Sequence, residues 1–190
     1  GLYSKMEKRF SRGLTFLVSF TFSKLLDDAS SVFDSALGIG SVASFPAADS
    51  FNRSLERDVS SGNIPKVLAI SYTYDLPIGP GHSFHPQGAL GRLASGWQLT
   101  GDVSMQSGLP LAIAQATNNN AFAGFATQRP RCIADPELPA SQRTTTHFFS
   151  TTAFQTTPQF MIGTCSRNPV RGPAYRSADL ALAKRTQLRN

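Results

Sequence analysis

Apolar and polar residues alternate along residues 14–26, where every second position from Leu14 to Phe22 is apolar. Successive residues of a strand point to opposite faces, so this spacing predicts a strand with one apolar face and one face of mostly small, polar side chains. On a helix the same apolar residues would scatter around the axis. The segment would reach about 43 Å at roughly 3.3 Å per residue, and a tilted strand needs about 9–11 residues to cross a bilayer. The pattern therefore predicts a strand that crosses a membrane and continues past it.

The same alternation recurs in four further segments, which are predicted to be strands near residues 2–10, 66–77, 96–115 and 176–188. A tight turn joins the first two strands at 11–13, whereas 27–65 and 116–175 are long, lack this pattern and are predicted to be loops. Short turns at one end of a sheet and long loops at the other are typical of outer-membrane barrels, whose long loops lie outside the cell. We therefore expect an all-β fold, an antiparallel meander of about five long strands that forms a section of a large transmembrane β-barrel with two long external loops.

The strand number and the chain ends indicate a fragment. About five strands are too few to close a barrel, because the smallest known barrels have about eight. Residue 1 already stands inside an apparent strand, and these residues contain no charged or apolar leader that would form a signal peptide. Hydrophobic residues make up 41% of the chain, and no run of about 18 apolar residues could form a membrane helix. We expect a piece of an integral outer-membrane protein of a Gram-negative cell, with the signal peptide outside it.

The chain is basic, with 18 Lys and Arg against 12 Asp and Glu. Neither a basic stripe nor a known nucleic-acid-binding module is present, so no nucleic-acid partner is expected. Guanidinium groups bind anionic sugars and phosphates well. Five arginines in the second predicted loop are candidates for contact with a ligand or with lipopolysaccharide, namely Arg129, Arg131, Arg143, Arg167 and Arg171. The alternative is that they pair with carbonyls and acids of their own loop.

Three aromatic residues stand near predicted strand ends: Tyr72, Tyr74 and Trp97. Tyr and Trp are enriched where a barrel meets the membrane–water interface. The sequence therefore predicts that these three residues belong to an aromatic girdle.

Both cysteines of the chain, Cys132 and Cys165, fall in the second predicted loop. Two cysteines in an oxidising compartment can form a disulfide. The alternative is two free, unrelated thiols.

Signals for catalysis or metal binding are weak. His82 and His85 have a two-ligand spacing, but they stand among Gly and Pro without an accompanying Glu. Asp27 and Asp28 are better explained as a solvated strand end than as an acid–base or calcium pair. His147 has no nucleophile motif such as GxSxG near it. We therefore expect no catalytic residue, no cofactor, no metal site and no enzymatic activity.

With the strands placed, four stretches show a family resemblance: LYSKMEKRFSRGLTFLVSFTFSKLLDDASS, ISYTYDLPIGPG, ASGWQLTGDVSMQSGLPLAI and CSRNPVRGPAYRSADLALAKR. Together they resemble the C-terminal barrel region of large TonB-dependent, Oar-like outer-membrane receptors, in particular the acidobacterial type with a carboxypeptidase-regulatory-like N-terminal domain. The stretches occur in the family's order and cover nearly the whole chain.

The resemblance implies a barrel of about 22 strands with a plug in its lumen. It also implies uptake of a scarce small ligand, such as a carbohydrate or a metal chelate, energised by the periplasmic TonB protein. The plug, the TonB-contacting segment and the last strands are expected outside these residues. Outer-membrane lipid and lipopolysaccharide are the expected surroundings. Some Oar-like proteins have adhesion or secretion-linked roles instead.

Two other classes fit the alternation. A soluble or surface β-sandwich for binding or adhesion also buries one face of each strand, but it should break the segment at 14–26 into shorter pieces. A passive porin would have the same wall and no plug.

Overall fold

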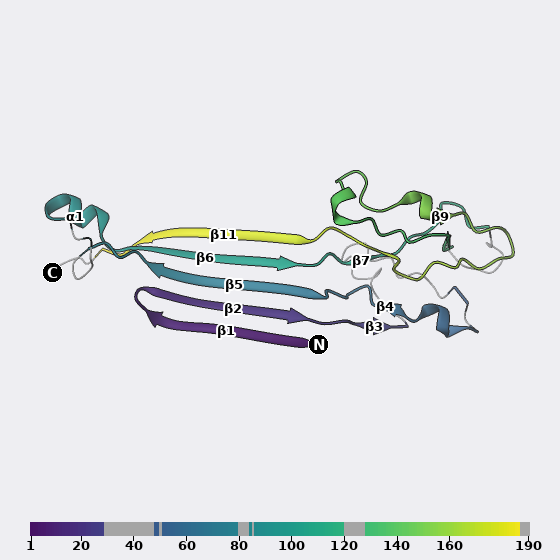
Figure 1. Ribbon diagram of the computed structural model, residues 1–190, viewed down its shortest axis with the longest axis horizontal. Coiled ribbons are helices and arrows are strands. Elements are labelled where there is room, and N and C mark those ends of the chain that lie inside the picture. The colour runs from purple at the N-terminus through teal and green to yellow at the C-terminus, as the bar shows by residue number, and fades with distance from the viewer. Residues whose placement is uncertain (29–47, 50, 80–83, 85, 120–127, 187–190) are drawn as a thin grey trace. The chain divides into compact units, whose positions relative to one another are not determined.

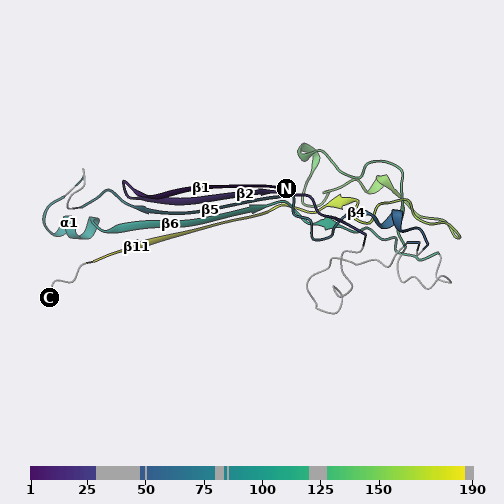
Figure 2. The same cartoon turned by 90° about the horizontal axis from the view of Figure 1, so that it is seen from below.

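The central element of the computed structural model, which describes residues 1–28, 48–49, 51–79, 84, 86–119 and 128–186, is a five-stranded antiparallel sheet (Figure 1). Neighbouring strands follow one another in the order of the chain. They are β1 (Leu2–Ser11), β2 (Leu14–Phe22), β5 (Lys66–Asp75), β6 (Trp97–Gln106) and β11 (Tyr175–Lys184). Figure 2 shows them as a single layer with β1 and β11 at its two edges. The prediction of an all-β antiparallel meander is confirmed.

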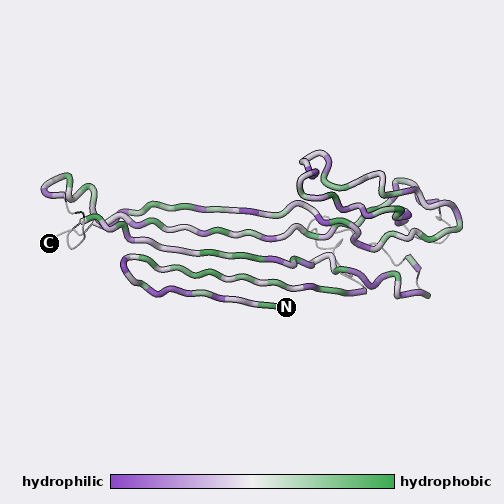
Figure 3. The backbone as a smooth tube through the Cα atoms, viewed as in Figure 1, coloured by the Kyte–Doolittle hydropathy of each residue, from purple (hydrophilic) through white to green (hydrophobic). Residues whose placement is uncertain are grey.

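The register places apolar residues of neighbouring strands opposite one another in the middle of the sheet. Val18 pairs with Ile70, which pairs with Val103 on the next strand. Directly opposite residues share a face of the sheet, so the alternation within each strand (Figure 3) sorts the whole sheet into two faces. We call the first the apolar face; it carries Met6, Phe16, Phe20, Leu68, Ile70, Leu99, Val103, Leu180 and Leu182. The second, the polar face, carries Lys5, Glu7, Thr15, Ser71, Thr73, Thr100, Asp102 and Asp179.

The apolar face is open. Leu180 and Leu182 are 68% and 59% exposed, and Met6 is exposed as well. Within the described residues of this unit no second sheet covers these side chains. The apolar face is therefore not half of a sandwich core. It is an exposed apolar surface for which contact with an apolar environment is favourable.

Four predicted strands end earlier than expected. β5 ends at Asp75 rather than at residue 77, and β11 ends at Lys184, although its prediction ran to residue 188. β2 ends at Phe22 rather than at Leu26, and the expectation that it continues past a membrane is wrong. Phe22 pairs with Lys66, the first residue of β5. The residue before Lys66 is Pro65, which has no N–H to donate to a ladder. Likewise β6 ends at Gln106 rather than at Gln115.

The two ends of the sheet differ. At one end a turn through Arg12 (φ 53°) and Gly13 (φ 81°) joins β1 to β2, since two left-handed residues make the turn that fits a tight hairpin. The connection from β5 to β6 at the same end contains helix α1 (Gly88–Ala94), which the sequence analysis did not predict. We call this the short-turn end.

Among the described residues, no helix is both long and apolar enough to cross a bilayer.

The segments 23–65 and 107–174 form a compact unit of their own, here called the loop unit. They connect strand ends at the other end of the sheet, where Phe22 pairs with Lys66 and Gln106 with Tyr175. Three small sheets form within these segments: β3 (Leu26–Asp27) with β4 (Asp58–Val59) in the first, and β7 (Pro110–Leu111) with β10 (Val170–Arg171) and β8 (Arg131–Cys132) with β9 (Phe154–Gln155) in the second. Single turns of 3₁₀ helix lie at Arg53–Glu56, Ala140–Gln142 and Thr151–Ala153. The two predicted loops therefore contain short strands that pair across long sequence separations.

Candidate functional site

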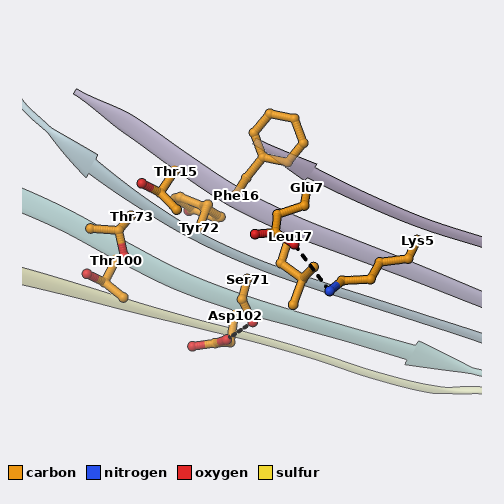
Figure 4. Close-up of a pocket in the computed structure, with 10 residues that line it drawn as sticks. All are labelled: Lys5, Glu7, Thr15, Phe16, Leu17, Ser71, Tyr72, Thr73, Thr100 and Asp102. Carbon is orange, nitrogen blue, oxygen red and sulfur yellow. Dashed lines mark hydrogen bonds and ion pairs between the residues drawn. The ribbon is translucent and has the colours of Figure 1, made fainter. Parts of the chain in front are cut away.

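An open hollow of about 320 Å³ lies on the polar face of the sheet (Figure 4). Strands β1, β2, β5 and β6 line it, and the polar lining residues of each strand stand at alternate positions, because alternate residues of a strand share a face. The polar side chains that line it are Lys5, Glu7, Thr15, Ser71, Thr73, Thr100 and Asp102. The other lining residues are Phe16, Leu17 and Tyr72.

Two polar contacts organise the hollow. Lys5 Nζ lies 3.2 Å from Glu7 Oε2 on β1. Ser71 Oγ donates a hydrogen bond to the carboxylate of Asp102, which lies directly opposite on β6. Both side chains of the Lys5–Glu7 pair are about half exposed, and ion pairs in such a setting add little to stability. Their charges therefore remain available to water and solutes.

A row of hydroxyl groups crosses the sheet beside these charges. Thr73 lies opposite Thr15 on β2 and opposite Thr100 on β6. Hydroxyl groups both donate and accept hydrogen bonds, whereas carboxylates accept and the ammonium group donates. The hollow thus offers every kind of hydrogen-bonding group that a polar, uncharged or weakly charged solute can use.

The structure places Arg129 in the interior of the loop unit. Its guanidinium group forms an ion pair with Glu56, and both side chains are about 95% buried, with 4% and 5% of their area exposed. Arg129 Nη1 also donates to the carbonyl of Leu55 at 3.2 Å. This contact joins the two long segments of the loop unit, so the partners of Arg129 come from the other predicted loop and not from its own.

Arg167 and Arg171 have the same kind of surroundings. The guanidinium of Arg167 binds the carboxylate of Asp27 and is almost fully buried, and burial lowers the pKa of Arg167 from its ordinary value. Arg171 Nη1 donates to the carbonyls of Asn63, at 3.0 Å, and Gly108, at 2.8 Å. These arginines bind the loop unit's own oxygens.

The other two candidate arginines lie nearer the surface. Arg143 Nε donates to the carbonyl of Leu138 at 2.6 Å, and its guanidinium lies 5.4 Å from the ring centre of Phe148. Arg131 is half-buried in β8. Ligand contact by these two residues stays a prediction.

Cys132 and Cys165 form a disulfide in the structure. Cys165 is buried, and its N–H donates to the carbonyl of Pro130 at 3.2 Å. The bond crosses 33 positions of the sequence and closes the segment that contains β8 and β9.

The aromatic residues Tyr72, Tyr74 and Trp97 all belong to the apolar face, since Tyr72 pairs with Phe16 and Tyr74 with Leu14. Trp97 begins β6 at the short-turn end, opposite Lys184. Its indole Nε1 donates to the carbonyl of Leu93 in α1 at 2.9 Å. Tyr and Trp are enriched at membrane interfaces, and the place of these three residues in an aromatic girdle stays a prediction.

The remaining chemical candidates have structural contacts or lie outside the described residues. Asp28 forms an exposed ion pair with Arg53 at 2.5 Å. The N–H of His147 donates to Thr144 Oγ1 at 2.9 Å, within a turn. His82 and His85 lie outside the described residues.

Sequence reasoning did not find the carboxylates that bind the arginines. Glu56 stands 73 positions from Arg129, and Asp27 stands 140 positions from Arg167. The one available signal was the scarcity of acids, which makes each acid in the loops a plausible partner for a neighbouring cation.

Comparison with known proteins gives one result for the whole length of the chain. A family model described as an outer membrane beta barrel domain matches residues 1–190. No curated protein and no solved structure matches the chain.

Proposed function

The chain belongs to the family of outer membrane beta barrel domains, and on that premise we propose that its sheet is a section of the wall of a TonB-dependent receptor. The apolar face meets lipid, the polar face lines the water-filled lumen, and the loop unit forms part of the external mouth that binds a scarce nutrient. Energy reaches the barrel through TonB-contacting parts of the protein outside these residues.

The observation that carries the proposal is the separation of the sheet into two faces. The five strands have 9 or 10 residues each, and a tilted strand needs about 9–11 residues to cross a bilayer. Exposed leucines on one face and charged or hydroxyl groups on the other satisfy both solvents that a barrel wall meets. The same arrangement in water would leave the whole apolar face exposed.

The edges of the sheet support a larger barrel. In the described part of the chain β1 and β11 do not pair with each other. Backbone groups in lipid need hydrogen-bond partners, so a spanning sheet has to close into a barrel. Further strands on both edges meet this need, as in the receptor family that the sequence resembles.

The nature of the ligand follows from the groups available. The hollow carries hydroxyls, carboxylates and an ammonium group beside Phe16, Leu17 and Tyr72. Such a surface favours polar solutes such as carbohydrates or hydrated metal chelates over apolar ones.

We propose no catalytic role, no cofactor and no nucleic-acid partner. Lipopolysaccharide is the proposed neighbour of the loop unit.

An uptake assay in a Gram-negative cell tests the transport role. Cells that lack this protein and cells that lack TonB should lose uptake of the same labelled solute from a panel of carbohydrates and metal chelates. Uptake that needs this protein but continues without TonB would identify a passive porin instead. Adhesion without any lost uptake would favour the surface-binding role.

The soluble sandwich is the weaker alternative. It predicts a second layer over the apolar face, and in the described residues of the sheet unit there is none. It also predicts a chain that stays monodisperse without detergent, which a purification in the presence and absence of detergent would decide.

A further inference from the structure

Helix α1 exposes two leucines at the short-turn end of the sheet. Leu90 and Leu93 are 73% and 66% exposed, and residues three positions apart on a helix lie on the same side. Gly88, the first residue of the helix, and Gly96, two residues after it, have φ of 70° and 78°, conformations that few other residues adopt. The leucines therefore form a small apolar surface in a defined place rather than in a random coil.

Two residues of the apolar face hold the end of this helix. The carbonyl oxygen of Leu93 accepts hydrogen bonds from Trp97 Nε1, at 2.9 Å, and from Lys184 Nζ, at 2.7 Å. Trp97 and Lys184 lie opposite each other at the end of the β6–β11 ladder, and the ammonium group is 5.6 Å from the centre of the indole ring. The exposed surface of α1 is thus attached to the last row of the apolar face.

The chemistry of this end matches a lipid headgroup layer. Trp and Lys place apolar bodies in lipid and polar tips in the headgroup region. Arg12 in the β1–β2 turn and Arg185 after β11 add positive charge at the same end, which attracts anionic headgroups. The acid at this end, Asp75, accepts a hydrogen bond from Gln98 on the polar face at 2.6 Å. The leucines therefore continue an apolar face that ends in a row of interface residues.

We propose that α1 is an interfacial anchor, which lies in the headgroup region of the phospholipid leaflet at the short-turn end and inserts Leu90 and Leu93 toward the acyl chains. With seven residues the helix is far too short to span the bilayer, but an amphipathic helix can lie in the plane of the interface. This inference rests on the proposed contact of the apolar face with lipid.

Depth-dependent fluorescence quenching tests the anchor. Both cysteines of the chain are in the disulfide, so a Leu90→Cys variant has one free thiol within these residues for an environment-sensitive fluorophore. The protein is reconstituted in vesicles of phosphatidylethanolamine and phosphatidylglycerol that carry a spin-label quencher near the headgroup or near the end of the acyl chain. We expect blue-shifted emission and stronger quenching by the shallow quencher than by the deep one. Leu93→Cys is the second variant.

Two matched positions on β11 separate the anchor from the barrel wall. A label at Leu180→Cys, on the apolar face, should be quenched best by the deep lipid quencher, and a label at Ala181→Cys, on the polar face, by iodide in water. If lipid quenchers act on the label at position 180, while the labels at positions 90 and 93 are quenched only by iodide or by no quencher, the anchor is disproved. The proposed barrel wall is then retained. If Leu180 does not respond to lipid, the proposed wall fails and the anchor fails with it.

Discussion

The ring of Tyr72 lies over Gly101, its direct partner on the next strand. A methyl group added to Gly101 would lie 2.6 Å from both Cζ and Oη of the tyrosine. A glycine within a strand often marks a place where another group approaches the backbone closely, and an aromatic ring over it covers the open backbone. On the apolar face the ring of Tyr72 therefore occupies the volume that a side chain at position 101 would need.

Replacing Gly101 with Ala should lower the free energy of unfolding by about 1–3 kcal/mol, because the ring has to leave its position. Tyr72→Ala should lower it as well, through lost packing. In the double variant the loss should be smaller than the sum of the two single losses, since the clash no longer exists. Urea-induced unfolding in lipid vesicles, followed by tryptophan fluorescence, measures all three.

The matched control is Gly62→Ala in the loop unit, where an added methyl group would have no atom within 4 Å. This variant should unfold nearly as the parent protein does. Strictly additive losses at positions 72 and 101 would show that the two residues do not compete for space.

The buried pair of Arg129 and Glu56 gives a second prediction. Removing one partner leaves the other charge buried and unpaired, so Arg129→Met or Glu56→Gln should destabilise the loop unit by about 3–5 kcal/mol. The double variant Arg129→Met with Glu56→Leu should recover much of this loss, because no unpaired charge remains. Hydrogen exchange of loop-unit amides, with the sheet amides as internal reference, reports the effect.

The exposed pair of Asp28 and Arg53 serves as its control. These side chains are 49% and 72% exposed, and Arg53→Gln should change stability by about 1 kcal/mol or less. An equal loss in the two pairs would mean that the burial of Arg129 does not decide its role. Ligand binding that depends on the Arg129 charge, with the loop unit intact, would restore the ligand-contact hypothesis for that residue.

Reduction of the disulfide should act on the loop unit and leave the sheet unchanged. The bond closes a loop of 33 positions, for which the chain-entropy model gives about 3–4 kcal/mol. Replacing Cys132 and Cys165 with Ser should therefore increase cleavage of the loop unit by an added protease, with strands β5 and β6 still protected in vesicles. Unchanged cleavage would show that the other contacts of the loop unit suffice.

The strands of the sheet could be predicted because each one carries its own pattern. The alternation of Phe16, Val18 and Phe20 fixes the faces of β2 without knowledge of any neighbour. The end of β2 could not be predicted in this way, since it depends on Pro65, the residue that precedes the partner strand β5. Helix α1 was missed because its sequence, GALGRLA, is short and contains two glycines, and its contacts with Trp97 and Lys184 come from outside it.

The candidate site was predictable in kind and not in detail. Alternation places Ser71 and Asp102 on polar faces, but only the register of β5 and β6 shows that they touch. The arginines were selected by residue type and by position in a loop. Their burial depends on carboxylates far away in the sequence, and no local pattern carries that information.

Adjacent residues on β11 allow the assignment of the two faces to be tested directly. Leu180 belongs to the apolar face and Ala181 to the polar face, and both are exposed. Leu180→Arg should cost about 2–4 kcal/mol if this position lies near the middle of the bilayer, because a charge there has to leave water. Ala181→Arg should cost far less, since its side chain reaches the aqueous lumen. The unfolding of both variants in the same vesicles provides the comparison. Equal costs, or a larger cost at position 181, would reverse the proposed orientation of the wall.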